Sequence, residues 1–248
     1  MPGERLRRAI VTGAASGIGR ATVMRLVGEG VQVLAVDINP AGLAKVANDN
    51  CQTLVADLSD PTARSRLVDA ADGADYLVNS HGVLGVKPIF DVTVEDWRRI
   101  QTINAESVFF LCQQIGPCLR PGGAIVNLSS SSSKLATTTE VAAYAASKTT
   151  ILSITRSFAY ALLSRPVRVN AICPGIVDTP MQDTVLEGMS KLRGMDIAAM
   201  DAARNKTVPL GRPAKPEECA GLIWFLLSDE ANYMTGQAVN FTGGLVNW

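Results

Sequence analysis

The fold of this chain is decided by one stretch, Val11-Thr12-Gly13-Ala14-Ala15-Ser16-Gly17-Ile18-Gly19, in which a short apolar run ends in a glycine-rich turn that opens a helical pattern. Gly13 permits a sharp turn, while Gly17 and Gly19 let the backbone approach a pyrophosphate and let the helix pack closely on a sheet. The start of such a helix offers free N–H groups and a positive dipole end. A turn without a ligand is the alternative, but the spacing, the position and the next element agree on a dinucleotide site. We expect the phosphates to lie against Gly13, Ser16, Gly17, Ile18 and Gly19.

Apolar runs alternate with longer helical patterns along the rest of the chain, and the runs are apolar throughout, as in parallel strands covered on both faces. Strand–helix alternation favours right-handed crossovers. We therefore predict one α/β domain over residues 1–248, a Rossmann-type doubly wound parallel sheet of about seven strands with helices on both faces. The predicted strands are Arg8–Thr12, Gln32–Val36, Thr53–Ala56, Tyr76–Asn79, Ala124–Leu128, Val167–Ile172 and Gln237–Phe241. The predicted helices are Ile18–Glu29, Pro40–Ala47, Thr62–Ala71, Val94–Leu119, Ala143–Ser164 and Pro216–Leu227.

Composition excludes several classes of function. The 248 residues are 47% hydrophobic, and Lys+Arg and Asp+Glu each number 23, so no broad basic surface for nucleic acid is indicated. Arg5, Arg7 and Arg8 are interpreted as a solvated strand start. We find no signal peptide and no apolar span long enough for a membrane helix, which predicts a cytoplasmic protein. With one histidine and five scattered cysteines, we expect no metal site and reduced, mostly buried thiols.

The acidic residue after the second strand bears on the choice of cofactor. Asp37 follows Gly19 by eighteen residues, where a carboxylate can accept both hydrogen bonds of a ribose diol and repel a 2′-phosphate. The turn carries Ala14, Ala15 and Ser16 rather than a basic residue. We therefore expect NAD. The alternative is that Asp37 caps the next helix.

A second informative run is Tyr144-Ala145-Ala146-Ser147-Lys148, because residues four apart lie on one face of a helix. A phenol, with an unperturbed pKa of about 10, is a poor base at neutral pH. A neighbouring ammonium favours the phenolate, so Lys148 is expected to lower the pKa of Tyr144. The polar tract Ser129–Ser133 directly follows a predicted strand, at the edge where such sheets bind ligands.

Together these features resemble the short-chain dehydrogenase/reductase family. The resemblance runs from Ile10-Val11-Thr12-Gly13 to Met234-Thr235-Gly236-Gln237 and includes Val208-Pro209-Leu210-Gly211-Arg212. The chain departs from the family at Ser80-His81, where Asn-Ala is usual, and at Thr242, where Asp is usual. The Thr62–Ala71 helix is also shorter than is common in the family, and neither this nor the departure at Thr242 touches the catalytic groups.

The resemblance implies a catalytic set of Asn104, Ser130, Tyr144 and Lys148. Asn104 would kink its helix and hold a water that links the lysine to solvent. For the serine, counting three on from Asn127 selects Ser130, whereas counting thirteen back from Tyr144 selects Ser131. An extra residue is easier to absorb in the loop Lys134–Glu140 than at the strand end, which favours Ser130.

The resemblance also implies cofactor contacts at the other strand ends. Asp57 would hold the adenine amino group, Leu58 the ring, and Ile176 and Thr179 the nicotinamide carboxamide, while Lys148 and Tyr144 would lie at the nicotinamide ribose. Asn79 and Gly82 would lie beside the cofactor. His81 could act as a base, but a neutral imidazole packed near ribose or substrate is the favoured interpretation, since Tyr144 and Lys148 already cover proton transfer.

The implied reaction is hydride transfer from a secondary alcohol to NAD, with Tyr144 taking the hydroxyl proton and Ser130 holding the oxygen. Residues 179–212 carry no strand signal and are predicted to form the lid segment over the substrate. Its charged helices resemble those of polyol, sugar-alcohol and diol dehydrogenases. The rivals are a ketoreductase of 3-oxoacyl thioesters or quinones, and a regulator that binds dinucleotide without turnover. The family also implies a homotetramer, with Phe109-Phe110-Leu111 and Leu245-Val246-Asn247-Trp248 as apolar surface.

Overall fold

The computed structural model describes residues 5–71, 73–135 and 138–248. Within them seven parallel strands form one sheet in the order β3-β2-β1-β4-β5-β6-β7. The strands are β1 Arg8–Thr12, β2 Gln32–Asp37, β3 Cys51–Val55, β4 Tyr76–Asn79, β5 Ala124–Leu128, β6 Arg168–Pro174 and β7 Ala238–Phe241. The predicted doubly wound sheet is confirmed, and strand bounds differ from prediction by two residues or fewer.

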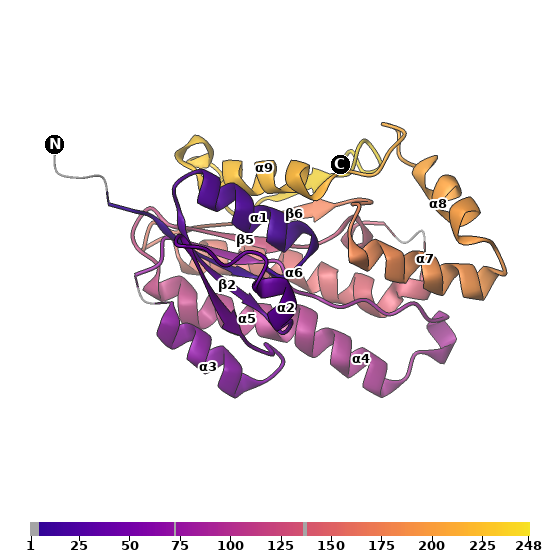
Figure 1. Cartoon of the computed structure of the whole chain (residues 1–248), viewed down its shortest axis with the longest axis horizontal. Helices are drawn as coiled ribbons and strands as arrows, with labels where there is room; N and C mark the ends of the chain where they lie inside the picture. The colour runs from indigo at the N-terminus through magenta and orange to yellow at the C-terminus, as the bar shows by residue number, and fades with distance from the viewer. Residues whose placement is uncertain (1–4, 72, 136–137) are drawn as a thin grey trace.

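Helices cover both faces of the sheet (Figure 1). The α1 and α9 helices lie on one face, where Leu26 and Ile223 are fully buried. On the other face α3, α5 and α6 bury Leu67, Ile115 and Ile151. The α-helices are α1 Gly17–Gly28, α2 Pro40–Leu43, α3 Pro61–Ala70, α4 Val94–Gln101, α5 Ser107–Ile115, α6 Ala142–Ala161, α7 Pro180–Arg193, α8 Ile197–Asn205 and α9 Pro216–Leu227. Because both faces are covered, every residue of β5 is buried, which explains why four of its five residues are apolar and why Asn127 is held by side-chain hydrogen bonds.

The strand order fixes where a ligand can enter. From β1 the chain crosses to β2 on one side, whereas β4 lies on the other side, with Thr12 paired to Asn79 and to Val36. Connections that leave in opposite directions open a crevice at the carboxyl ends of β1 and β4. The glycine turn begins at this crevice. The lid segment forms α7 and α8, which extend beyond the same edge of the sheet (Figure 1).

Two predicted helices differ from the observed ones. The pattern 94–119 is interrupted between α4 and α5 by a π-helical segment, Thr102–Glu106. The pattern 40–47 gives only the four residues of α2. A Cβ at Gly42 would lie 2.5 Å from the Ala15 Cβ, so this helix is held close against the glycine turn. Asn48 and Cys51 then form an isolated bridge that ends the helical run and starts β3.

Burial corrects part of the surface predicted to mediate assembly. Leu111 is fully buried against the sheet, and Val246 is buried near the carboxyl terminus. Phe109 and Trp248 remain exposed. Four of the five free cysteines are buried, and Cys118 is exposed. Among the described residues, no helix is both long enough and apolar enough to cross a membrane.

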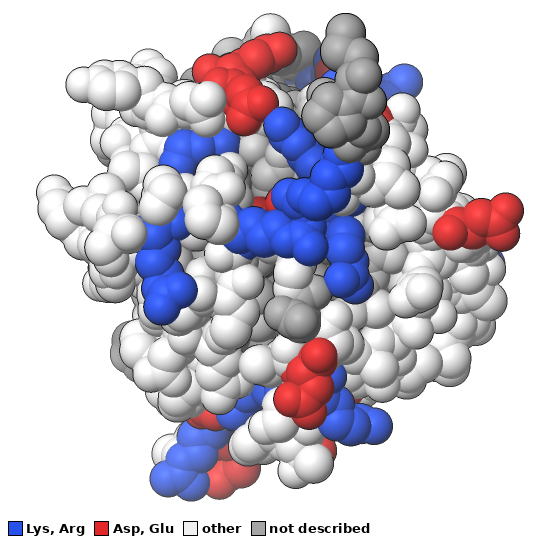
Figure 2. All heavy atoms as spheres, turned by 90° about the vertical axis from the view of Figure 1, so that its left-hand side faces the viewer, with Lys and Arg blue, Asp and Glu red and all other residues white. Residues whose placement is uncertain are grey.

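Basic side chains gather on the face where the strands begin (Figure 2). Arg5 pairs with Asp75 at 2.6 Å and Arg7 pairs with Asp229 at 2.9 Å. Arg168 donates to the last carbonyls of α9, including Leu226 O at 2.7 Å. These contacts give the basic residues structural partners at the end of the sheet opposite to the crevice.

Candidate active site

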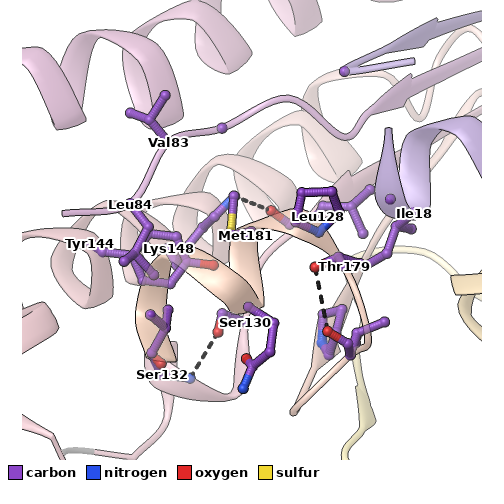
Figure 3. A pocket seen from close by; sticks show the side chains of 18 of the residues that line it. Ile18, Val83, Leu84, Leu128, Ser130, Ser132, Tyr144, Lys148, Thr179 and Met181 are labelled. Carbon is purple, nitrogen blue, oxygen red and sulfur yellow. Dashed lines mark hydrogen bonds between the residues drawn. The ribbon is translucent and has the colours of Figure 1, made fainter. Parts of the chain in front are cut away.

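A cavity of about 1030 Å³ lies at the carboxyl ends of the strands and continues beneath α7 and α8. Figure 3 shows Tyr144, Lys148 and Ser130 grouped on one side of it, and Ile18 and Thr179 on the other. The residues predicted from sequence that line the cavity are Gly13, Ser16, Gly17, Ile18, Gly19, Asp37, Asp57, Leu58, Gly82, Ser130, Tyr144, Lys148, Ile176 and Thr179. Asn79 and Asn104 are not among the lining residues.

The glycine turn has no room for side chains. Gly13 has a φ of 66°, and a Cβ there would lie 2.7 Å from the His81 Cα. A Cβ at Gly19 would lie 2.0 Å from the Gly13 carbonyl oxygen, so the helix packs directly on the turn. Ser16 is the N-cap of α1, but its side chain does not cap the helix. The first N–H groups of α1 are therefore left for a ligand, as a phosphate site requires.

Asp37 joins the end of β2 to the glycine turn. Its Oδ2 accepts a hydrogen bond from Ala15 N at 3.0 Å, and its Oδ1 accepts one from Asn39 N at 2.9 Å. The helix-cap alternative for Asp37 is wrong, because the Asn39 side chain caps α2 by accepting from Gly42 N. Each carboxylate oxygen keeps a lone pair for a further donor in the cavity.

Asp57 and Leu58 follow β3 on the same side of the cavity as Asp37. The Oδ1 of Asp57 accepts hydrogen bonds from the hydroxyl and the backbone N–H of Ser59. These bonds hold the pKa of the Asp57 carboxyl below its usual value. The carboxylate stays ionised and can accept from a donor such as an exocyclic amine.

The Tyr144 and Lys148 side chains project from one face of α6 into the buried end of the cavity. The Lys148 Nζ lies 5.7 Å from the centroid of the Tyr144 ring and donates to Leu128 O at 2.8 Å. Ser130 follows β5 and lines the cavity near Tyr144, where its side chain opposes the rise in the pKa of the phenol. The Ser130 hydroxyl also accepts from Ser132 N at 3.1 Å (Figure 3). The geometry favours Ser130 over Ser131; residues 136–137 of the loop with the expected extra residue lie outside the described residues.

Burial dominates the ionisation of this pair. It raises the pKa of the Tyr144 phenol, and the Ser130 side chain opposes that rise. It also lowers the pKa of Lys148 to about 8. The expectation that Lys148 lowers the phenol pKa is not met by the protein groups alone, because burial outweighs the effect of Ser130. A positive charge brought next to the phenol by a ligand would favour the phenolate.

Asn104 sits in the π-helical segment and joins three parts of the site. Its Oδ1 accepts from Val83 N at 2.8 Å, and its Nδ2 donates to Val83 O at 2.8 Å and to Ser147 Oγ at 3.0 Å. A Cβ placed on Gly82 would lie 3.2 Å from Asn104 Oδ1 and 3.4 Å from Lys148 Nζ. Asn104 therefore positions the segment that faces the lysine.

Two other strand ends hold residues predicted to contact the cofactor. Asn79 is buried between β4 and β5 and donates to Asn127 Oδ1 at 2.9 Å, so its side chain joins strands below the cavity. Thr179 precedes α7 and faces the glycine turn, since a Cβ at Gly17 would lie 3.1 Å from the Thr179 Cγ2. Thr179 and Ile176 thus close the cavity opposite α1.

The His81 side chain links the end of β1 to the start of α5. Its Nδ1 lies 2.7 Å from Thr12 Oγ1, and its Nε2 lies 2.6 Å from Ser107 Oγ. Because the Ser107 hydroxyl donates to Ile103 O at 2.7 Å, its oxygen accepts from His81 Nε2–H, which assigns Nδ1 as the acceptor from Thr12. Burial, reinforced by the charge of Lys148, lowers the pKa of His81 to about 3. The imidazole is therefore neutral and held by structural contacts. This agrees with the predicted neutral imidazole and disfavours a role for His81 as a base.

Several residues of the site were not identified from the sequence. Thr12 and Ser107 hold His81, and three arginines, Arg99, Arg193 and Arg204, line the part of the cavity near the lid segment. Isolated hydroxyls and arginines carry no local signal. These hydroxyls and arginines differ from ordinary surface residues only in their positions in the folded chain, where they contact His81 or line the cavity.

Known proteins are similar to this chain along nearly its whole length. A family model described as Enoyl-(Acyl carrier protein) reductase matches residues 13–246. The chain is 33% identical to 3-oxoacyl-[acyl-carrier-protein] reductase FabG of Thermotoga maritima over 96% of both chains. It is 33% identical to galactitol 2-dehydrogenase of Agrobacterium fabrum over 97% of this chain and 96% of that one.

This chain belongs to the short-chain dehydrogenase/reductase family.

A solved structure agrees with the sequence relatives. A single-substitution variant of actinorhodin polyketide ketoreductase, crystallised with NADPH, superposes with a TM-score of 0.92 at 30% identity and covers 98% of both chains. The family establishes an oxidoreductase that binds a nicotinamide dinucleotide and acts on alcohol or ketone substrates. The relatives described above are two reductases and one dehydrogenase, and they act on different substrates. The substrate of this short-chain dehydrogenase/reductase therefore has to be inferred from its own cavity.

Proposed function

We propose that this protein is an NAD-dependent dehydrogenase of a small secondary alcohol of the polyol, sugar-alcohol or diol class. The observation that carries the proposal is the set of three side chains that line the cavity together, with Lys148 Nζ 5.7 Å from the centroid of the Tyr144 ring and Ser130 close enough to oppose the rise in the pKa of the phenol. Galactitol 2-dehydrogenase, a relative over nearly the full length, supports the substrate class.

In the proposed reaction, Tyr144 accepts the hydroxyl proton of the alcohol and Ser130 donates a hydrogen bond to the oxygen as the carbonyl forms. Lys148 lies where its ammonium can stabilise the phenolate and bind the nicotinamide ribose. When bound, NAD would supply the hydride acceptor, and its oxidised nicotinamide would bring a positive charge that favours the Tyr144 phenolate. Asn104 keeps Val83 and Ser147 in place around the lysine.

The preference for NAD over NADP is supported by the adenosine side of the cavity. Asp37 and Asp57 line this side, and the cationic residues that line the cavity are Arg99, Lys148, Arg193 and Arg204, which belong to α4, α6, α7 and α8. A 2′-phosphate would lie near the Asp37 carboxylate, which accepts hydrogen bonds from the backbone of Ala15 and Asn39. None of the four cationic lining residues would be its partner there.

The same groups run the reverse reaction, so a biosynthetic ketoreductase of 3-oxoacyl or quinone substrates is the second candidate. The FabG relative and the polyketide ketoreductase favour it. A regulator that binds dinucleotide without turnover is disfavoured, because Tyr144, Lys148 and Ser130 are all in place. We also propose a cytoplasmic homotetramer.

The deciding experiment measures absorbance at 340 nm with purified protein, comparing polyols and diols with NAD against 3-oxoacyl thioesters and quinones with NADPH. The proposal requires kcat/KM for an alcohol with NAD to exceed that for the ketones with NADPH. Faster reduction of the thioesters or quinones with NADPH would establish the ketoreductase instead. Tight NADH binding with no turnover of any substrate would indicate the regulator.

A further inference from the structure

The lid segment brings to the cavity an arginine with one buried guanidinium nitrogen that has no hydrogen-bond partner. Arg204 lies on α8 and lines the cavity, and its Nη1 atom is buried without a hydrogen-bond partner. Leaving a buried charged donor without a partner costs more than leaving a neutral one, and native proteins rarely do so. An arginine in this state indicates a ligand that supplies the missing acceptor.

A second unpartnered donor of the lid segment lines the same cavity. Gln182 lies on α7, and its Nε2 atom is also buried without a partner. Its neighbours along α7, Val185 and Met189, and Met200 on α8 form an apolar cluster with Leu84 and Val86. Two donors in an apolar surrounding offer strong hydrogen bonds to an anionic oxygen group, since the low local dielectric strengthens them.

The charges around the lid segment leave Arg204 available. Arg193 pairs with Glu140 at 3.2 Å, and the Glu140 carbonyl accepts from Lys87 N at 2.8 Å, so Arg193 ties α7 to the loop before α6. Burial lowers the pKa of Arg204 and the charge of Asp201 opposes that effect, but the hydrogen bond of the Asp201 carboxylate goes to Asn205 Nδ2 at 3.1 Å. The carboxylates that line the cavity, Asp37 and Asp57, belong to the adenosine side. The lid side therefore presents positive charge that the lining residues do not neutralise.

We propose that the substrate of this dehydrogenase is a hydroxy acid, whose hydroxyl-bearing carbon lies at Tyr144 and whose carboxylate binds Arg204 and Gln182 beneath the lid segment. The inference rests on the proposed dehydrogenase activity, and it moves the substrate from neutral polyols and diols to hydroxy acids, either polyhydroxylated or simple. Of the two lid-segment arginines that line the cavity, Arg193 is already paired with Glu140, so Arg204 offers a single positive charge, which suits a monoanion better than a phosphate dianion. Arginine suits a carboxylate because its fork of N–H groups matches the two oxygens.

The test compares short hydroxy acids bearing the hydroxyl at carbon 2, 3 or 4, and aldonic acids, with their neutral methyl esters, using NAD and the full chain. Arg204→Met removes the charge but keeps the length of the side chain. Arg204→Lys restores the charge without the fork. Arg66→Met, an exposed arginine on α3, is the matched control. We expect the parent to prefer one acid over its ester. Arg204→Met should lose about 10- to 100-fold in kcat/KM on that acid, as for a hydrogen bond to a charged group, and little on the ester.

A binding measurement separates this inference from catalysis. In the Tyr144→Phe background saturated with NAD, calorimetric titration of the preferred acid should show about tenfold weaker binding when Arg204→Met is added. Equal turnover of acids and esters, or equal losses in Arg204→Met and Arg66→Met, would overturn the carboxylate site while leaving the dehydrogenase intact. Absence of any alcohol oxidation by the parent with NAD or NADP would instead refute the proposed function on which the inference rests.

Discussion

Acid should destabilise this protein through its single histidine. In the folded chain the pKa of His81 is about 3, because the ring is buried between Thr12 and Ser107, whereas the ordinary value is 6.5. Between these values the unfolded chain binds a proton that the folded chain does not, so stability falls as pH drops through 6.5. Linkage between pH 7 and pH 5 gives a loss of about 2 kcal/mol from this one group.

The assay is urea unfolding followed by tryptophan fluorescence at pH 7 and pH 5, at one protein concentration so that any assembly is held constant. Acidic residues also titrate in this range, so the decisive quantity is the difference between parent and His81→Gln. The variant should lose about 2 kcal/mol less stability than the parent over the same interval. Ser107→Ala, which keeps the imidazole, should retain most of the parent's acid sensitivity. Equal pH dependence in parent and His81→Gln would refute the assignment of a buried neutral ring.

Three further substitutions test the cofactor turn, the cofactor preference and the π-helical segment. Gly19→Ala places a Cβ 2.0 Å from the Gly13 carbonyl oxygen, so the affinity for NADH, measured by fluorescence titration, should fall about tenfold or more. The control is Gly28→Ala on the same helix, whose Cβ meets nothing within 4 Å and which should leave the NADH affinity unchanged. Asp37→Ser should shift the ratio of kcat/KM with NAD to kcat/KM with NADP by about tenfold or more toward NADP. The control Asp69→Ser, at an exposed position on α3, should leave this ratio unchanged. An unchanged ratio in Asp37→Ser would show that Asp37 does not select the cofactor. Asn104→Leu deletes the bonds to Val83 and Ser147 and should lower kcat about tenfold or more with little change in NADH affinity; loss of affinity alone would place its role at the cofactor.

The sequence predicted well those features that depend on the spacing of residues close together along the chain. The glycine turn and the Tyr144–Lys148 pair depend on residues within one turn or one helix, and unbroken apolar runs located each strand within two residues. The end of α2 was predicted less well, because the helical run gives way to the Asn48–Cys51 bridge that leads into β3, a contact that the helical pattern of the sequence does not show.

What sequence could not supply is where side chains point once distant segments meet. Asn79 follows a strand, as predicted, yet it turns toward Asn127 rather than into the cavity. The pKa of Tyr144 depends on burial by the whole site, which outweighs the effect inferred from its neighbour on the helix. The unpartnered state of Arg204 emerges only from the packing of α8 against the rest of the cavity.

The most direct test of the proposed chemistry is the rate of NADH formation by Tyr144→Phe on the best alcohol of the parent. Proton transfer by a positioned group contributes roughly 10²- to 10⁴-fold, so kcat should fall by that factor while the Kd for NADH stays within about threefold of the parent value. An unchanged kcat in a variant that binds NADH normally would contradict the assignment of Tyr144 as the group that takes the substrate proton.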